Sequence, residues 1–427
     1  MPRPRPRSCP PGGERGILVK VVIIGAQWGD EGKGKVVDFL AEEADLVLRY
    51  SGGANAGHTV VVEGQIHKFH LVPSGVLNPG KTVVLGIGMV VDLATLFEEL
   101  AQLEQVGVSW QGRVLLSDRA HVVLPRYKQM DQARDRARAS PLGTTGRGIG
   151  ITYALKAFRE GVRVVDLFDA GVWRSLEAED RTYLEPYLER VRSLMVDVSA
   201  LVYENRGRNI LLEGAQGTLL DLDLGTYPFV SSGTSCAAGA AIGAGMGPQE
   251  IDRVVGVCKA YSTRVGNGPF PSRFTVERDG DLEEKIRGIG KEYGVTTGRP
   301  RRCGYLDLPA LRYACRSNGI GSLCITKMDI YDGMPELKVC TGYRIDGRLA
   351  SGFPASAEAL DRAEPVLEAV SGWSAPVKGC RRFADLPQEA RDYIRYIEEY
   401  SGVSVDVVSV GPNRSETIVR RDPWTPS

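Results

Sequence analysis

The sequence predicts an α/β protein, a single large domain around a mostly parallel central β-sheet with a nucleotide site of the phosphate-loop kind. Two observations carry this prediction. Short apolar runs alternate along the chain with segments of helical periodicity, which is the rhythm of βαβ units. The first apolar run, residues 17–24, passes through a glycine-rich turn into a periodic stretch at 36–41. The N–H groups at the start of such a helix attract phosphate.

Length and composition are those of an ordinary globular protein. The chain has 427 residues, 43% of them hydrophobic, and Lys plus Arg equals Asp plus Glu at 53 each. No global charge therefore draws it to nucleic acid or to a membrane surface. The sequence contains neither an apolar stretch long enough to span a bilayer nor the apolar core of a secretion signal. We expect a cytoplasmic protein whose eight scattered cysteines are free thiols.

The order of elements supports one domain. Residues 1–16 are mostly Pro, Arg and Gly and are predicted to be a disordered leader. Residues 17–427 show neither an internal repeat nor a linker, so they are expected to form one catalytic domain. Residues 176–205 predict one long amphipathic helix or two shorter ones. Further strands are expected at 45–50, 82–91, 113–116, 209–212, 254–260, 321–326 and 403–410, and a strand at 338–344 with a helix at 387–400 is expected to complete the same sheet.

The glycine-rich turn after the first strand is the strongest local signal. Gly29 to Lys35 fits the Gly-x-x-x-x-Gly-Lys spacing, but Val36 stands where that motif needs a hydroxyl for magnesium. Asp30 and Glu31 lie inside the loop, where polyphosphate would repel them unless a magnesium ion lay between carboxylate and phosphate oxygens. A plain turn with solvated charges is the alternative. Two lysines flanked by glycine favour the phosphate site.

Four further loops follow predicted strands or helices and carry polar side chains among small residues. Residues 51–59 present Asn55 and His58, and residues 213–218 place Gln216 at a strand end, where open α/β sheets bind ligands. Residues 140–150 combine glycines with two threonines and an arginine, which suits an oxyanion or a simple connection. Residues 295–302 hold three arginines and two threonines, which suits carboxylate or phosphate, with an exposed basic turn as the alternative.

A strand ending in Thr-Lys-Met-Asp, residues 326–329, favours guanine over adenine, because the carboxylate can accept hydrogen bonds from N1–H and the 2-amino group of guanine. A surface Lys–Asp pair is the alternative. Residues 409–412, Ser-Val-Gly-Pro, form another strand-end turn that could cover the nucleotide.

Taken together, these strings resemble the adenylosuccinate synthetase family. The resemblance runs from about Val21 to the C-terminus and rests on 27–35, 55–58, 143–148, 213–218, 225–228, 295–299 and 326–329. It implies a cytoplasmic homodimer that joins IMP to L-aspartate using GTP and magnesium, in the branch of purine synthesis that leads to AMP. The rival hypothesis is a GTP-binding switch-type GTPase, which explains neither Val36 nor the arginine loop nor Gln216.

The resemblance also implies roles for single residues. Asp30 takes the N1 proton of IMP, so that O6 attacks the γ-phosphate of GTP and 6-phosphoryl-IMP forms. His58 donates toward the transferring phosphate or the leaving oxygen, and Lys33 with magnesium spreads the developing charge. The amine of aspartate then displaces phosphate at C6. Gln216 completes the catalytic set, and the magnesium ligands are Asp30 and the carbonyl of Gly57.

The implied binding residues fall in the same loops. GTP is expected at Gly29, Asp30, Glu31, Gly32, Lys33, Gly34, Lys35, Gly57, His58, Thr59, Arg301, Lys327, Met328, Asp329, Ser409, Val410 and Gly411. IMP is expected at Asp30, Glu31, Gly32, Lys33, Asn55, Ala56, Gly57, His58, Thr145, Gln216, Ser231 and Arg299, with Arg159 supplied by the other subunit. Aspartate is expected at Val295, Thr296, Thr297, Gly298, Arg299, Pro300 and Arg301.

Four positions depart from the family's usual pattern. Ser231 replaces a threonine and keeps the hydroxyl, whereas Leu224 replaces a histidine, Ile151 a proline and Arg273 an acid. None of these removes a residue with an implied catalytic role.

Overall fold

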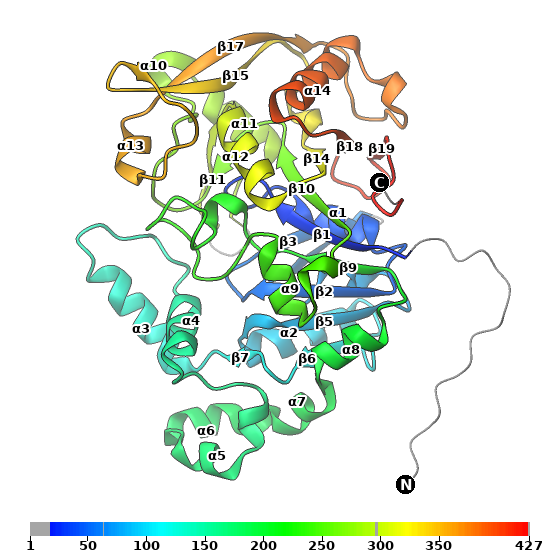
Figure 1. The fold of residues 1–427 in the computed structure, drawn as a ribbon, viewed down its shortest axis with the longest axis vertical. Coiled ribbons are helices and arrows are strands. Elements are labelled where there is room, and N and C mark those ends of the chain that lie inside the picture. Colours follow the sequence, from blue (N-terminus) through cyan, green and yellow to red (C-terminus); the bar gives the residue numbers. More distant parts are fainter. Residues whose placement is uncertain (1–17, 63, 295–297, 426–427) are drawn as a thin grey trace, which may run out of the picture.

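A large, almost entirely parallel β-sheet forms the centre of the protein (Figure 1). The structure is a computed structural model and describes residues 18–62, 64–294 and 298–425. In spatial order the strands are β19 (Thr417–Val419), β18 (Val405–Ser409), β14 (Ser322–Thr326), β10 (Arg253–Lys259), β1 (Lys20–Gly25), β9 (Ile210–Glu213), β2 (Leu46–Gly52), β5 (Thr82–Val91), β6 (Val114–Ser117) and β8 (Met195–Val196), with β7 (His121–Val122) beside β5. Among the described strands of this sheet, β18 and β19 form the antiparallel pair. The predicted fold class is confirmed.

The central strands read as continuous apolar runs because both faces of the sheet are covered. Every residue of β1 is buried. Val22 and Ile24 pack into one hydrophobic cluster, and Val21 and Ile23 pack into the other. The first face is covered by α8 (Val198–Glu204), α9 (Ala238–Ala244), α12 (Leu308–Asn318) and α14 (Gln388–Ser401), and the second by α1 (Lys33–Leu40) and α2 (Leu93–Gln105).

Smaller elements surround this sheet. Strands β3 (His58–Val62) and β4 (Gln65–Phe69) form a hairpin, and β11 (Ser262–Arg264) pairs with β12 (Arg302–Gly304). The remaining helices are α3 (Pro125–Arg136), α4 (Ile149–Phe158), α5 (Ala170–Ser175), α6 (Ala178–Leu184), α7 (Leu188–Leu194), α10 (Val276–Asp279), α11 (Leu282–Gly290) and α13 (Ala357–Asp361).

Two expectations about the elements were wrong. Residues 176–205 form three short helices, α6, α7 and α8, instead of one long helix or two shorter ones, with Pro186 in a 3₁₀ turn between α6 and α7 and with β8 before α8. The strand expected at 338–344 does not join the central sheet. It lies within β15 (Met334–Ile345), which pairs with β13 (Leu306–Asp307), β16 (Arg348–Leu349) and β17 (Glu364–Trp373) in a second sheet, at the top of Figure 1.

Other predictions concern the whole chain. No helix in the described ranges is long and apolar enough to cross a membrane. Each cysteine that the structure describes is a free thiol, and all but Cys380 are buried. The predicted leader, residues 1–16, lies outside the described residues.

Candidate active site

The predicted motifs meet at one edge of the central sheet. Six neighbouring strands, β18, β14, β10, β1, β9 and β2, run parallel, so their carboxyl ends lie side by side. The segments that follow these ends include the phosphate loop, Gln216, Asn55 and the predicted guanine-binding residues. This is where an open α/β sheet binds its ligand.

The phosphate loop is held in its shape by its own acid. Glu31 is completely buried, and its Oε1 accepts from the backbone N–H groups of Gln27 (3.1 Å) and Gly29 (2.8 Å). Its Oε2 pairs with Lys33, which is only 3% exposed. Gly32 then caps α1 in the left-handed region, so the helix begins at Lys33, earlier than predicted. The Glu31 carboxylate is therefore already bonded to the loop and to Lys33, which leaves Asp30 as the loop acid that could share a magnesium ion with phosphate oxygens.

Lys35 points to the C-terminal loop of the predicted guanine site. Its buried Nζ donates to Ser409 Oγ (2.7 Å) and to the carbonyls of Gly411 (2.6 Å) and Glu416 (2.9 Å). Burial lowers the pKa of Lys35 to about 8. The second lysine of the motif therefore links the first helix to residues 409–416.

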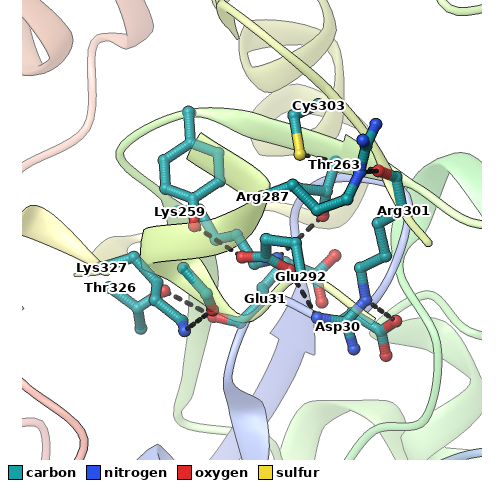
Figure 2. Close-up of polar contacts among 12 residues, drawn as sticks. Asp30, Glu31, Lys259, Thr263, Arg287, Glu292, Arg301, Cys303, Thr326 and Lys327 are labelled. Carbon is teal, nitrogen blue, oxygen red and sulfur yellow. Dashed lines mark hydrogen bonds and ion pairs between the residues drawn. The ribbon is translucent and has the colours of Figure 1, made fainter. Parts of the chain in front are cut away.

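Asp30 belongs to a line of alternating charges that leads away from the loop (Figure 2). It has a positive φ of 60°, which is uncommon for a residue other than glycine and is concentrated at functional sites. Its Oδ2 accepts from Arg301 Nε at 2.8 Å, and the carboxylate remains 29% exposed. Arg301 Nη1 also donates to Glu292, which is completely buried.

Glu292 is the centre of this line of charges. Lys259 Nζ lies 2.8 Å from both of its carboxylate oxygens, and Tyr261 donates its hydroxyl proton to Oε1 (2.5 Å). Burial would raise the pKa of Glu292, but the charges of Lys259 and Arg301 outweigh burial and lower it. Burial lowers the pKa of Lys259 to about 8, and the charge of Glu292 opposes this lowering whereas the charge of Arg301 adds to it. The network fixes Arg301, the arginine predicted to contact both aspartate and GTP, against the phosphate loop.

His58 is paired with a carboxylate. It is the first residue of β3 and 6% exposed, and its Nδ1 lies 2.5 Å from Oε1 of Glu213, the last residue of β9. Burial lowers the pKa of His58 although the charge of Glu213 opposes this. Burial would raise the pKa of Glu213, but the charge and hydrogen bond of His58, with Arg49, bring it below its usual value. The carboxylate is therefore ionised at neutral pH.

Three residues predicted to bind IMP carry buried polar atoms that lack a hydrogen-bond partner within the described chain. They are Asn55 Oδ1, Gln216 Nε2 and Ser231 Oγ. Buried polar atoms are almost always paired, because an unmet one costs about 1–3 kcal/mol. Gln216 also has a positive φ of 57°. These atoms are suited to a polar ligand such as a purine nucleotide.

Close backbone approaches connect these residues to the neighbouring loops. A Cβ built on Gly52 would lie 3.3 Å from Gln216 Oε1, and one built on Gly150 would lie 3.1 Å from Ser232 Oγ. Arg299 is exposed and donates to the carbonyl of Gly143 at 3.2 Å, so the arginine loop reaches the loop at 143–148, in which Thr145 is exposed. We call Asn55, Thr145, Gln216, Ser231 and Arg299 the rim of the site.

The predicted guanine site lies on two adjacent strand ends. In the register of β14 and β18, Ile325 is opposite Val408, so Lys327–Asp329 and Ser409–Gly411 follow neighbouring ends. Lys327 has a positive φ of 62° and donates to the carbonyl of Gly290 (2.9 Å). Burial raises the pKa of Asp329. Met328 is fully buried in the core.

The remaining predicted residues differ in where they lie. Val295, Thr296 and Thr297 lie outside the described residues. Arg159 is exposed in the left-handed region at the end of α4. Gly57 and Thr59 flank His58 at the start of the β3 hairpin.

The sequence-based prediction assigned no role to Glu213, Glu292, Lys259 or Tyr261. Glu213 gave a signal, since an acid ends an apolar strand directly before glycine. The other three act through contacts between distant segments, which the sequence does not display.

The fold and the site define an α/β enzyme that acts on nucleotides. The chain belongs to the adenylosuccinate synthetase family, whose model matches residues 22–418. Curated adenylosuccinate synthetases from Moorella thermoacetica and Sorangium cellulosum are 48% and 49% identical; the alignments cover 95% of this chain in both cases and 100% and 99% of those proteins.

One solved structure agrees with this assignment, and a second shows a similar fold. The fully ligated adenylosuccinate synthetase from Plasmodium falciparum superposes with a TM-score of 0.89 at 36% identity, covering 94% of this chain and 99% of that one. The succinoaminodeoxyadenylate synthetase of cyanophage S-2L has a TM-score of 0.63 at 21% identity, with 96% and 97% covered, which is a likeness of fold.

Proposed function

We propose that the chain carries out the reaction of its family, the GTP-dependent ligation of IMP and L-aspartate to adenylosuccinate with release of GDP and phosphate, through 6-phosphoryl-IMP. The observation that carries the proposal is that the phosphate loop, Asn55, Gln216 and the predicted guanine site all follow the carboxyl ends of six adjacent parallel strands. The reaction needs three substrates held together, and we expect this edge of the sheet to bind all three.

The first step activates a poor leaving group. Asp30 removes the N1 proton of IMP, electron density moves to O6, and O6 attacks the γ-phosphorus of GTP while the bond to the β-phosphate oxygen breaks. Asp30 suits this role because its carboxylate is partly exposed and held from one side by Arg301. Lys33 and His58 stabilise charge on the phosphoryl group, and His58 does so through Nε2 because Nδ1 faces Glu213.

The second step forms the carbon–nitrogen bond. The amine of aspartate attacks C6, and phosphate leaves with the electron pair of the C6–O bond. The arginines at 299 and 301 suit the two carboxylates of aspartate, since guanidinium binds carboxylate in a bidentate manner. To bind aspartate, Arg301 has to share or leave its contact with Asp30. Rim amides and hydroxyls at Asn55, Thr145, Gln216 and Ser231 bind IMP.

We expect the protein to supply only a few of the ligands of a magnesium ion at this site. No cluster of three or more His, Cys, Asp or Glu side chains suited to a metal exists among the described residues. Magnesium is commonly held by one or two carboxylates together with substrate phosphates and water. Asp30 and the carbonyl of Gly57 would supply the protein's share, and the ion would neutralise phosphate charge.

We also propose a cytoplasmic homodimer in which Arg159 completes the partner's IMP site. Exposure of Arg159 and of its neighbour Phe158, which is 68% exposed, supports an interface at the end of α4. Mixing an Arg159→Ala variant with an Asp30→Asn variant tests this. If Arg159 acts across the interface, mixed dimers regain activity that neither variant has alone.

An omission assay tests the reaction. GTP, IMP, L-aspartate and magnesium are supplied together and then with one component left out, while phosphate release and the absorbance of the 6-substituted purine are followed. We expect both signals only in the complete mixture. GTP hydrolysis that is equally fast without IMP and aspartate would instead identify a GTPase of the switch type.

A further inference from the structure

Glu213 is placed where it governs the orientation of His58. Its carboxylate is completely buried at the end of β9, with Oε1 2.5 Å from His58 Nδ1. Ser74 holds it from the other side, because the Ser74 N–H donates to Oε2 at 2.9 Å and the Ser74 hydroxyl donates to Oε1 at 3.2 Å. Three hydrogen bonds thus fix the carboxylate and the ring relative to each other.

The histidine has little freedom to adopt another position. A Cβ built on Gly34, in the first turn of α1, would lie 3.0 Å from His58 Cβ and 3.4 Å from Ser74 Oγ. The phosphate-loop helix therefore packs directly on the histidine and the serine. Gln216 belongs to the turn that follows Glu213, so the end of β9 positions both Glu213 and Gln216.

The chemistry of the pair selects one tautomer. An ionised carboxylate can only accept, so Nδ1 of His58 must carry the hydrogen in this contact. Nε2 is then the ring nitrogen left for the reacting groups. A carboxylate that holds a catalytic histidine in one tautomer and one orientation has a large effect on rate without touching the substrate. Arg49, fully buried nearby, adds positive charge that favours the ionised carboxylate.

We propose that Glu213 is the positioning residue of the phosphoryl-transfer step: together with Ser74 it holds His58 with hydrogen on Nδ1 and with Nε2 directed to the transferring phosphoryl group. This inference rests on the role proposed above for His58. It adds to Asp30 a second carboxylate with a part in the first step, one that acts on the histidine and neither binds substrate nor takes the purine proton.

Steady-state kinetics of Glu213→Gln test the proposal. The amide keeps the size of the side chain but no longer dictates which ring nitrogen carries the hydrogen. We expect kcat to fall by about 100-fold, in line with the loss of a supporting carboxylate, while KM for each substrate changes less than about threefold. Ser74→Ala, which removes one of the two supports, should lower kcat by a smaller factor.

A matched control is available in Glu99. This second buried glutamate accepts from the backbone N–H groups of His70, Leu71 and Val72 and contacts no predicted catalytic side chain. Glu99→Gln should lower the melting temperature while kcat stays within about threefold of the wild-type value, because three backbone bonds are weakened and His58 is untouched.

Two readouts separate positioning from simple structural support. Nitrogen-15 NMR of the four histidines, with His58 assigned by His58→Ala, should show the Nδ1–H tautomer at His58 and a mixture in Glu213→Gln. The double variant His58→Ala/Glu213→Gln should be no slower than His58→Ala alone, because Glu213 acts through the ring. An unchanged kcat in Glu213→Gln, an unchanged tautomer, or additive losses would each overturn the proposal.

Failure of the proposed reaction would look different. In that case the wild-type protein would fail the omission assay, whereas the NMR comparison of wild type with Glu213→Gln would still decide what Glu213 does to His58.

Discussion

The two sides of the site differ in how their polar groups are satisfied. On one side, which we call the floor, lie the phosphate loop (residues 25–35), His58, Glu213, Glu292 and Arg301. Their charged groups are bonded within the protein: Glu31 to Lys33, His58 to Glu213 and Arg301 to Glu292. On the rim, by contrast, buried atoms of Asn55, Gln216 and Ser231 lack a partner in the described chain.

This difference separates two functions. A floor whose charges are already paired is preorganised, so that groups facing the transition state do not have to reorganise during the reaction. Rim groups without internal partners have no bonds to lose when substrate arrives, so they contribute directly to affinity. We therefore expect substitutions in the floor to lower rate or stability, and substitutions in the rim, except at Gln216 with its implied catalytic role, to weaken binding alone.

Asp30 gives the largest expected effect, because it belongs to the floor but is partly exposed toward substrate. Asp30→Asn keeps the tolerance of a left-handed backbone and removes the base. We expect kcat to fall by about 1,000-fold, within the range of general-base catalysis, while calorimetry still detects nucleotide binding. The matched control is Asp346→Asn, since Asp346 also has a positive φ, 49°, and is paired with Arg362. Near-normal turnover in Asp30→Asn would exclude Asp30 as the base.

Asp307 connects the floor to the core and should give the floor a pH-dependent stability. Its backbone N–H donates to Ser262 Oγ, which also contacts the side chain of Gln27 beside the phosphate loop. Burial raises the pKa of Asp307 to about 6 from 3.8. Because the carboxyl pKa is higher in the folded state than in the unfolded state, protonation of Asp307 stabilises the folded state. This stabilisation is complete below pH 3.8 and is lost as the pH rises through 6.

Urea unfolding between pH 4 and 7 measures this effect. Relative to Asp307→Asn, which has no proton to lose, the wild-type protein should lose about 3 kcal/mol of unfolding free energy as pH rises. Glu364→Gln, at an exposed position of β17, is the control and should follow the wild-type profile. Parallel profiles for the wild type and Asp307→Asn would mean that Asp307 does not titrate in this range.

The fold class and the gathering of the predicted motifs at one edge of the sheet could be predicted from the sequence because both follow from local patterns. A buried parallel strand is an apolar run, and parallel strands bring their ends together, so motifs far apart in the chain could be assigned to one site. The second sheet was missed because residues 334–345 read like any other strand, and their partner, 364–373, lies beyond an intervening segment. The pairs of Asp30 with Arg301 and of His58 with Glu213 join residues 271 and 155 positions apart, which periodicity cannot reveal.

Gly217 tests how tightly the floor is packed. Its φ of −141° would allow alanine, but a Cβ there would lie 2.4 Å from the carbonyl oxygen of Gln27 and 2.6 Å from the N of Gly29. Overpacking of this kind costs about 1–3 kcal/mol, and we expect Gly217→Ala to lower kcat/KM by roughly tenfold to 100-fold by displacing the phosphate loop. Gly207→Ala should have no effect, because a Cβ there would meet no described atom within 4 Å. An active Gly217→Ala variant would show that the loop adapts.

Ser231 gives the smallest effect and the sharpest test of the rim. Because Ser231 Oγ has no partner in the described chain, Ser231→Ala breaks no internal hydrogen bond and should leave the melting temperature unchanged. Loss of one neutral hydrogen bond to IMP should raise KM for IMP by about threefold to tenfold, with kcat nearly constant.

Ser322 is the control for this variant. Its Oγ is also buried and has no partner among the described residues, but Ser322 lies at the opposite end of a strand, as the first residue of β14. Ser322→Ala should change neither KM nor stability. Destabilisation by Ser231→Ala, or an equal rise of KM in both variants, would show that a buried hydroxyl without a partner does not indicate a substrate contact. The distinction between rim and floor would then fail.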